Sequence, residues 1–276
     1  MVTLASLPDG PGIRISRAEL LALRDDPDTG GRMRPATRRP GAVAGRNQGS
    51  GMDLREIRAY VPGDDPRRLD PAATARTGHP HIRSLHEDRD DITLLLADYR
   101  AAMIWGTATD LRSVRAARFL ARAGWQAARR GGSTSAVTVS AAGVAHLAPA
   151  TGDRQMADIA ELLAHQHDRA LTESAMPDLG EALALAARLV PAGGRVTLAT
   201  CPGGWRSAEA GLARLARKRR VTVALILDES ETAPPKGVFA ISNGTTSHFA
   251  RLTPPELSAE SARLTALGVR VQEVLP

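Results

Sequence analysis

Cys201 is the side chain with the strongest potential for covalent chemistry, in the run Thr200-Cys201-Pro202-Gly203-Gly204-Trp205. It follows a stretch with the pattern of a buried strand, and nucleophiles often lie at the carboxyl ends of such strands. A reactive thiolate would need a base nearby, for which His165 and His167 are candidates. A lone cysteine beside a buried strand is more often an apolar side chain that fills the core. We therefore predict no catalytic residue, and keep a hydrolase that uses Cys201 or the rim near Asp98 as an alternative.

The histidines are spaced too closely for a zinc site of the helical kind. His79 and His81 flank Pro80, and His165 and His167 are two residues apart. Two histidines that bind zinc from one helix are four residues apart, and carboxylate or cysteine ligands complete the site. The glycine pairs of the chain also lack the spacing of a phosphate-binding loop. We therefore predict no bound metal and no cofactor.

Arginine supplies nearly all of the positive charge, since Lys218 and Lys236 are the only lysines. The formal net charge of +6 would suit a protein that binds nucleic acid. An arginine-rich composition is also what a GC-rich coding sequence produces, and few aromatic residues offer base stacking. Nucleic-acid binding is therefore kept only as an unlikely alternative. Its candidate residues fall on one predicted helix and in one short run: Arg115, Arg118, Arg122 and Arg129, and Arg217, Lys218, Arg219 and Arg220.

From residue 91 onward, apolar runs of strand length alternate with helical patterns. Strands are predicted at residues 92–97, 195–200, 221–227 and 269–274, with a hairpin at residues 136–147. Helices are predicted at residues 109–130, 154–167, 179–189, 207–218 and 255–267, the first opened by Thr109-Asp110. This order predicts a doubly wound α/β domain with a mostly parallel sheet and one antiparallel edge strand. Ligands of such sheets bind beyond the carboxyl ends of the strands, here after Ala97, Thr200 and Leu227.

Composition divides the chain into three parts. Residues 1–50 are predicted to be a partly flexible, irregular N-terminal arm with a short helix between Ser16 and Arg24, residues 51–90 a segment packed on the main domain, and residues 91–276 the α/β domain. No run approaches the roughly 18 apolar residues of a membrane span, and the N-terminus lacks a secretory pattern. The single cysteine excludes an internal disulfide. We therefore expect a soluble, cytoplasmic protein.

A charged motif of fixed spacing fills the segment between the arm and the α/β domain. Pro62-Gly63-Asp64-Asp65 has the composition of a tight turn, in which proline presets φ and glycine permits a positive φ. Guanidinium and carboxylate groups alternate around this turn, and bidentate pairs between them can lock a segment without a large core. We predict an internal clamp, in preference to a surface that recognises a partner. The residues of this motif are Arg58, Tyr60, Gly63, Asp64, Asp65, Arg67, Asp70 and Arg76.

This motif resembles the signature of the domain of unknown function 58 family, which are bacterial von Willebrand factor A-like proteins. The resemblance covers about residues 40–107 and includes the glycine-rich lead Gly49-Ser50-Gly51, the Pro-Gly-Asp-Asp turn and the pair Ala75-Arg76. It implies a von Willebrand A-like, Rossmann-type fold and a MoxR-type AAA+ ATPase as partner. The chain departs from the family where Pro71 replaces a usual tryptophan, which puts one packing anchor in doubt.

The resemblance also implies where a metal site would lie. Von Willebrand A-like domains bind Mg²⁺ through an Asp-x-Ser-x-Ser motif, a later threonine and a final aspartate, all of which supply oxygen ligands. Asp98 retains the first aspartate, whereas the other ligand positions fall on Arg100, Ala102, Pro177 and Cys201. We therefore predict a degenerate metal-ion-dependent adhesion site. Arg100 is expected to pair with Asp98 and to act as a built-in cation.

Together the residues and the resemblance predict a non-enzymatic adaptor. Its implied partners are a MoxR-type AAA+ ATPase, other von Willebrand A-like proteins and client proteins in chaperone-like assembly or activation. Docking is expected through the rim of the sheet and the segment at residues 58–76, without Mg²⁺ at the usual site. Asp98 and Arg100 are the candidate partner-binding residues of the rim.

Overall fold

The computed structural model describes residue 10 and residues 12–26, 54–85, 92–173, 175, 177–242, 247–251 and 253–276. The chain forms two compact units, which are described separately. The first, called the α/β unit, comprises Met1–Gly31 and Asp91–Pro276, and the second, called the small unit, comprises Arg32–Asp90. Within the described residues, no helix has the length and hydropathy needed to cross a membrane.

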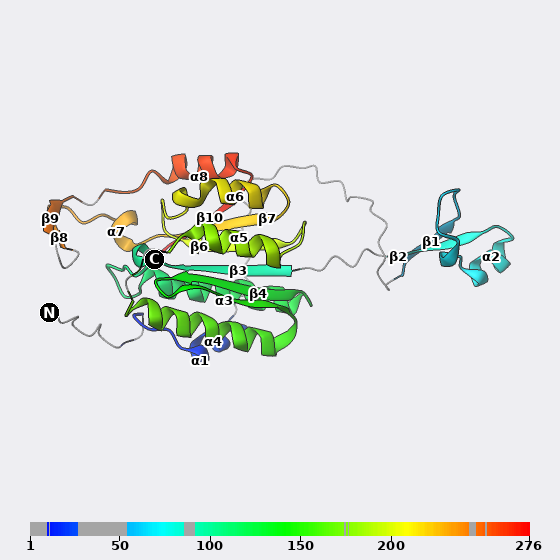
Figure 1. Cartoon of the computed structure of the whole chain (residues 1–276), viewed down its shortest axis with the longest axis horizontal. Helices are drawn as coiled ribbons and strands as arrows, with labels where there is room; N and C mark the ends of the chain where they lie inside the picture. The colour runs from blue at the N-terminus through cyan, green and yellow to red at the C-terminus, as the bar shows by residue number, and fades with distance from the viewer. Residues whose placement is uncertain are drawn as a thin grey trace. The chain divides into compact units, whose positions relative to one another are not determined.

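A six-stranded sheet in the order β10-β7-β6-β3-β4-β5 forms the centre of the α/β unit (Figure 1). Neighbouring strands are parallel except β5, which pairs with β4 in an antiparallel hairpin at the edge. This arrangement confirms the predicted mostly parallel sheet with one antiparallel edge strand. The strands are β3 (Ile92–Tyr99), β4 (Ser133–Ser140), β5 (Gly143–Ala150), β6 (Arg195–Thr200), β7 (Arg220–Ile226) and β10 (Arg270–Val274).

Helices cover both faces of this sheet, which confirms the α/β class (Figure 1). One face carries α3 (Arg112–Arg129) and α4 (Gly152–Ala170), and the other carries α5 (Leu179–Leu189), α6 (Glu209–Ala216) and α8 (Leu257–Ala266). Leu95 and Ala97 of β3 belong to the core of the first face, and Leu94 and Leu96 to the core of the second. β3 is therefore buried on both faces, as its continuous apolar run predicts.

Three predicted helices begin two or three residues later than their sequence patterns indicate, among them α8, which begins at Leu257 and not at Pro255. α3 begins at Arg112 after Leu111, which provides no side-chain cap. The predicted cap residue Asp110 instead binds Arg118 with its carboxylate at 2.8 Å. The pattern at residues 207–218 contains a 3₁₀ turn, η5 (Arg206–Ala208), before α6. Tertiary ion pairing and turn geometry therefore override the local cap signals.

The N-terminal residues that the structure describes pack against α3 and α4. The short helix predicted between Ser16 and Arg24 is confirmed as α1 (Arg17–Ala22), and the Ser16 hydroxyl caps it by accepting from Glu19 N at 3.1 Å. Leu20 is fully buried, and its carbonyl accepts a hydrogen bond from Trp125 Nε1 at 3.1 Å. Residues 12–26 are therefore part of the packed α/β unit, and the rest of the predicted arm, up to residue 50, lies outside the described residues apart from Gly10.

Three elements of the α/β unit that the sequence patterns did not indicate follow β7. They are α7 (Glu229–Thr232) and a separate antiparallel hairpin of β8 (Phe239–Ser242) and β9 (Ser247–Ala250). Figure 1 places α7 and this hairpin at the carboxyl-terminal end of the parallel strands.

The small unit contains more regular structure than its turn-rich sequence suggests. β1 (Leu54–Ala59) pairs antiparallel with β2 (His81–Leu85), and η3 (Pro66–Arg68) and α2 (Pro71–Thr77) lie between them. Pro71 opens α2, where a missing N–H has no cost, and Asp70 caps the helix by accepting from Ala73 N at 2.8 Å. The departure from the family tryptophan therefore falls on the first residue of a helix.

Candidate functional site

β3 and β6 are neighbours in the sheet, and the helices that follow their carboxyl ends lie on opposite faces. β3 leads to α3 on one face of the sheet, and β6 leads to α6 on the other. Ligand sites of doubly wound sheets lie at such switch points. Asp98 near the end of β3 and Thr200 at the end of β6 are both buried here. The structure thus brings together the residues that the sequence placed on the rim.

Arg100 holds the carboxylate of Asp98 on both oxygens. Its Nε donates to Asp98 Oδ1 at 2.8 Å, and its Nη2 donates to Oδ2 at 2.7 Å. The Thr200 hydroxyl also donates to Oδ2, at 2.6 Å. The hydrogen bond to Asp98 raises the pKa of Arg100, so the guanidinium stays charged. A side chain of the protein itself therefore neutralises a carboxylate that is only 1% exposed.

Gly204 fixes the outer side of this ion pair. Its carbonyl accepts a hydrogen bond from Arg100 Nη2 at 2.5 Å. A Cβ atom at Gly204 would overlap Thr200 Oγ1 and lie 3.1 Å from Cys201 Sγ, so only glycine fits this approach. The loop is held from α8 by Glu260, which accepts from Gly203 N at 2.6 Å and from Trp205 Nε1 at 2.5 Å.

Cys201 and the histidines of the hydrolase alternative are not brought together. Burial and the nearby Asp98 raise the pKa of Cys201, which makes its thiol a weak nucleophile. His165 is exposed and lines a hollow of about 550 Å³ between the N-terminal segment and α4. His167 is buried, with its Nε2 2.9 Å from Ser113 Oγ and its ring edge-on to Tyr99. No described hydrogen bond joins either histidine to Cys201.

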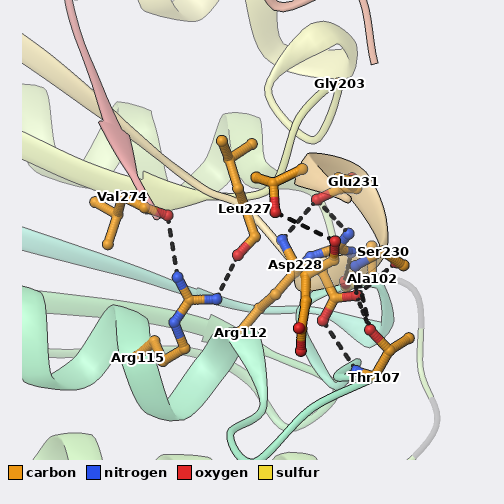
Figure 2. A network of polar contacts seen from close by, with 12 residues as sticks. Ala102, Thr107, Arg112, Arg115, Gly203, Leu227, Asp228, Ser230, Glu231 and Val274 are labelled. Atoms are coloured by element: carbon orange, nitrogen blue, oxygen red, sulfur yellow. Dashed lines mark hydrogen bonds and ion pairs between the residues drawn. The ribbon is translucent and has the colours of Figure 1, made fainter. Parts of the chain in front are cut away.

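Asp228, directly after the neighbouring strand β7, organises a second network at this edge (Figure 2). It accepts hydrogen bonds from the backbone and hydroxyl groups of Thr107 and Ser230, with Thr107 N at 2.9 Å and Ser230 Oγ at 2.5 Å. Burial alone would raise the pKa of Asp228, but these hydrogen bonds lower it to about 2. Asp228 therefore stays ionised and ties the loop after β3 to the start of α7.

Two arginines of α3 lie beneath this network. Arg112 forms a 2.7 Å ion pair with Glu231 and donates to the Ala102 carbonyl at 3.1 Å. Arg115 donates to the carbonyls of Leu227 and Val274, which end two adjacent strands (Figure 2). These contacts fix the edge of the sheet.

The remaining predicted ligand positions carry no oxygen side chain. Ala102 lies in η4 (Ala101–Met103), and Pro177 precedes α5, whose cap Asp178 accepts from Gly180 N at 2.8 Å. In the described part of the chain, no three His, Cys, Asp or Glu side chains are grouped so as to hold a metal ion.

Within the small unit, two aspartates of the motif form arginine pairs. Arg58 binds Asp64 with two hydrogen bonds of 2.8 and 2.7 Å, and Arg83 binds the buried Asp70 at 2.8 Å. Asp65 caps η3 through Arg67 N at 3.0 Å, Gly63 adopts a positive φ, and Tyr60 N donates to Pro80 O at 2.9 Å. The side chains of Arg67 and Arg76 are exposed. The predicted packing of this segment on the α/β domain stays a prediction.

The arginines of α3 form ion pairs and hydrogen bonds within the fold, and phosphate contact by them stays an untested alternative. Arg118 binds Glu19 and Asp110, and Arg122 binds Asp26. Arg129 donates to the Arg24 carbonyl at 2.7 Å. Together with Arg115, they attach the N-terminal segment and the strand ends to α3. The run at residues 217–220 is placed at the opposite edge of the sheet.

The comparisons with known proteins agree with the motif. The family model described as "Protein of unknown function DUF58" matches residues 56–260, which is most of the chain. The chain belongs to the DUF58 family. Uncharacterised proteins from Mycobacterium bovis and Mycobacterium tuberculosis are 50% identical to it over 60 residues. That stretch covers 22% of this chain and 19% of each relative, so the match spans about a fifth of their length.

Sequence reasoning missed the Asp228 network although the sequence contains a signal for it. An aspartate after a buried strand, followed three residues later by Glu231, fits a capping box, and the structure has that capping box at α7. Thr107 and Glu260 have no such signal, because their partners are distant in the sequence.

Proposed function

We propose that this chain is a non-enzymatic adaptor that docks a protein partner on the carboxyl edge of its sheet without a bridging metal ion. One observation carries the proposal. In the described part of the α/β unit, every large exposed apolar side chain follows the carboxyl end of a parallel strand: Trp105, Val238, Phe239, Phe249 and Leu275. Exposed apolar side chains that gather on one edge are typical of a protein-binding surface.

The Asp98 site lies on the same edge and does not suit Mg²⁺. In von Willebrand A-like domains, to which the family resemblance points, Mg²⁺ joins the domain to a carboxylate of the partner. Here the Arg100 guanidinium lies against Asp98 and the Gly204 carbonyl, and the other ligand positions lack oxygen side chains. We therefore interpret the site as a degenerate adhesion site with a built-in cation.

One nitrogen of the Arg100 guanidinium, Nη1, remains available to bind a partner. No described atom accepts a hydrogen bond from its Nη1, and the side chain is 18% exposed. A carboxylate of the partner that binds this nitrogen would take the place of the metal-bound carboxylate. The family resemblance suggests a MoxR-type AAA+ ATPase as that partner, with other von Willebrand A-like proteins and a client.

The test is a pull-down of the purified chain against host extract, in Mg²⁺ and in EDTA. We expect a MoxR-type ATPase in both samples, and its loss with Arg100→Asp and with Phe249→Ser. Phe249 is 82% exposed, so its replacement should leave stability unchanged. Ile57→Ser, at an exposed apolar residue of the small unit outside residues 58–76, is the matched control and should retain the ATPase. Recovery only in Mg²⁺, or loss with the control alone, would refute the proposal.

A further inference from the structure

The helix-to-strand turns at the amino edge of the sheet, where the parallel strands begin, are rich in arginine and lysine. Four helix-to-strand turns meet there, at residues 129–133, 188–195, 214–220 and 266–270. None of these turns contains an aspartate or a glutamate. The arginine run that the sequence analysis singled out is therefore one part of a larger basic surface.

Backbone hydrogen bonds join two of these turns, at residues 188–195 and 214–220, to each other. Gly193 N donates to the Lys218 carbonyl at 2.7 Å, and Arg220 N donates to the Gly194 carbonyl at 2.9 Å. Arg195 and Arg220 are partners in the parallel register of β6 and β7. Arg270 starts β10, the next strand along, beside Thr222. Strand spacing therefore sets Arg195 and Arg220 about 4.8 Å apart, with Arg270 on the next strand two residues further along.

Most of these cations have no role within the fold. Basic residues near helix C-termini often serve the helix dipole, and Arg219 does so for α5 by donating to the Val190 and Ala187 carbonyls at 2.7 and 2.5 Å. The side chains of six others are exposed and form no hydrogen bond or ion pair with any described residue. We call them the amino-edge patch: Arg188, Arg214, Arg217, Lys218, Arg220 and Arg270.

We propose that the amino-edge patch binds the phosphate backbone of duplex nucleic acid without reading its sequence. Guanidinium groups match phosphate oxygens in a bidentate manner, and a duplex presents one charge per roughly 1.7 Å of its axis. The exposed large apolar side chains described for the α/β unit lie at the other edge. Among the described residues, the amino edge therefore offers neither a stacking platform for single strands nor an apolar anchor for a membrane.

The test is fluorescence anisotropy of a mixed-sequence DNA duplex of about 25 base pairs with the full chain, over about 50 to 300 mM NaCl. Six phosphate contacts predict a slope of log K against log salt of about −5.4, and Arg217→Gln/Lys218→Gln/Arg220→Gln reduces it to about −2.7. At low salt this variant should bind at least about tenfold more weakly. All three side chains are exposed, so the variant should unfold at the wild-type temperature.

A control variant that removes the same number of positive charges elsewhere distinguishes the effect of the patch from the effect of net charge. Arg206→Gln/Lys236→Gln/Arg251→Gln removes three exposed cations from segments that follow the carboxyl ends of the strands. It should retain the wild-type slope and affinity. An equal loss of duplex affinity in both triple variants would show that net charge, and not the patch, causes binding. Absence of salt-dependent binding to the duplex would contradict the proposal. Tighter, patch-dependent binding to polyglutamate or to phosphatidylglycerol vesicles than to the duplex would overturn it in favour of another partner class.

Discussion

Asp98 and Arg100 depend on each other because the carboxylate is buried and the guanidinium reaches it from the rim. Asp98 is 1% exposed, and four hydrogen bonds end on its oxygens. A buried charge that loses its partner retains its desolvation cost, whereas an exposed pair contributes little. The residue types on the rim therefore favour a structural cation over a catalytic group.

Arg100→Ala is expected to lower the free energy of unfolding by about 3 kcal/mol, because it leaves Asp98 buried without a counter-charge. Urea denaturation measures this. The control is Arg263→Ala, which removes an equally bidentate but exposed pair with Glu209 and should cost under about 1 kcal/mol. Adding Asp98→Ala to the Arg100 variant should restore part of the loss. Similar small effects at both arginines would contradict the assignment.

His167 gives the protein a stability that depends on pH. Burial lowers its pKa from 6.5 to about 4, because the charged ring would lose its hydration. The unfolded chain therefore binds a proton at higher pH than the folded chain, and this contribution is full above pH 6.5 and is lost as pH falls through 4. We expect a decrease in unfolding free energy of up to about 3 kcal/mol across that window.

Urea denaturation at a series of pH values measures this slope, and His167→Asn should flatten it between pH 6.5 and 4. Asp228 acts in a separate window, because its lowered pKa affects stability only as pH falls from 3.8 towards 2. An unchanged slope in the His167 variant would show that other groups cause the pH dependence.

At the scale of elements, hydrogen bonds between loops stabilise the carboxyl edge of the sheet, where the chain leaves its strands. Asp228 links the loop after β3 to α7, and Glu260 links α8 to the loop after β6. Each link joins segments more than fifty residues apart in sequence. The loops that would meet a partner are therefore fixed in place by buried carboxylates.

Asp228→Ala is expected to lower the free energy of unfolding by about 3 kcal/mol, since it leaves buried donors of Ser230 and the Thr107 amide without an acceptor. Hydrogen exchange should accelerate at residues 104–111, near Thr107. Glu229→Ala, at the exposed neighbouring position in α7, should change neither measurement. Exchange confined to α7 in the Asp228 variant would show that the two loops are not coupled.

Local patterns predicted most elements of the α/β unit, and distant contacts explain the exceptions. The apolar runs at residues 92–97 and 195–200 identified β3 and β6 because strands buried on both faces require them. The hairpin of β8 and β9 was not predicted from the sequence, because its strands have only four residues each. The pairing of Arg100 with Asp98 followed from the family resemblance, which places Arg100 at a metal-ligand position beside Asp98, whereas Arg118 gave no sign that it binds Glu19, 99 residues away.

At the scale of the whole molecule, strand order decides which residues share an edge. The order β10-β7-β6-β3-β4-β5 brings four helix-to-strand turns to the amino edge and the loops after β3, β6 and β7 to the carboxyl edge. No local pattern contains that order, so the basic patch and the apolar edge were not predictable as surfaces. We propose different partners for the two edges, so variants at one edge should leave binding at the other unchanged.

We propose that Arg100 replaces a metal ion beside Asp98. Calorimetric titration of the isolated wild-type chain with Mg²⁺ up to about 10 mM tests this proposal. We expect no saturable binding, and the same trace for Asp98→Asn. Saturable binding by the wild-type chain that Asp98→Asn abolishes would place a metal at this site and contradict the proposal.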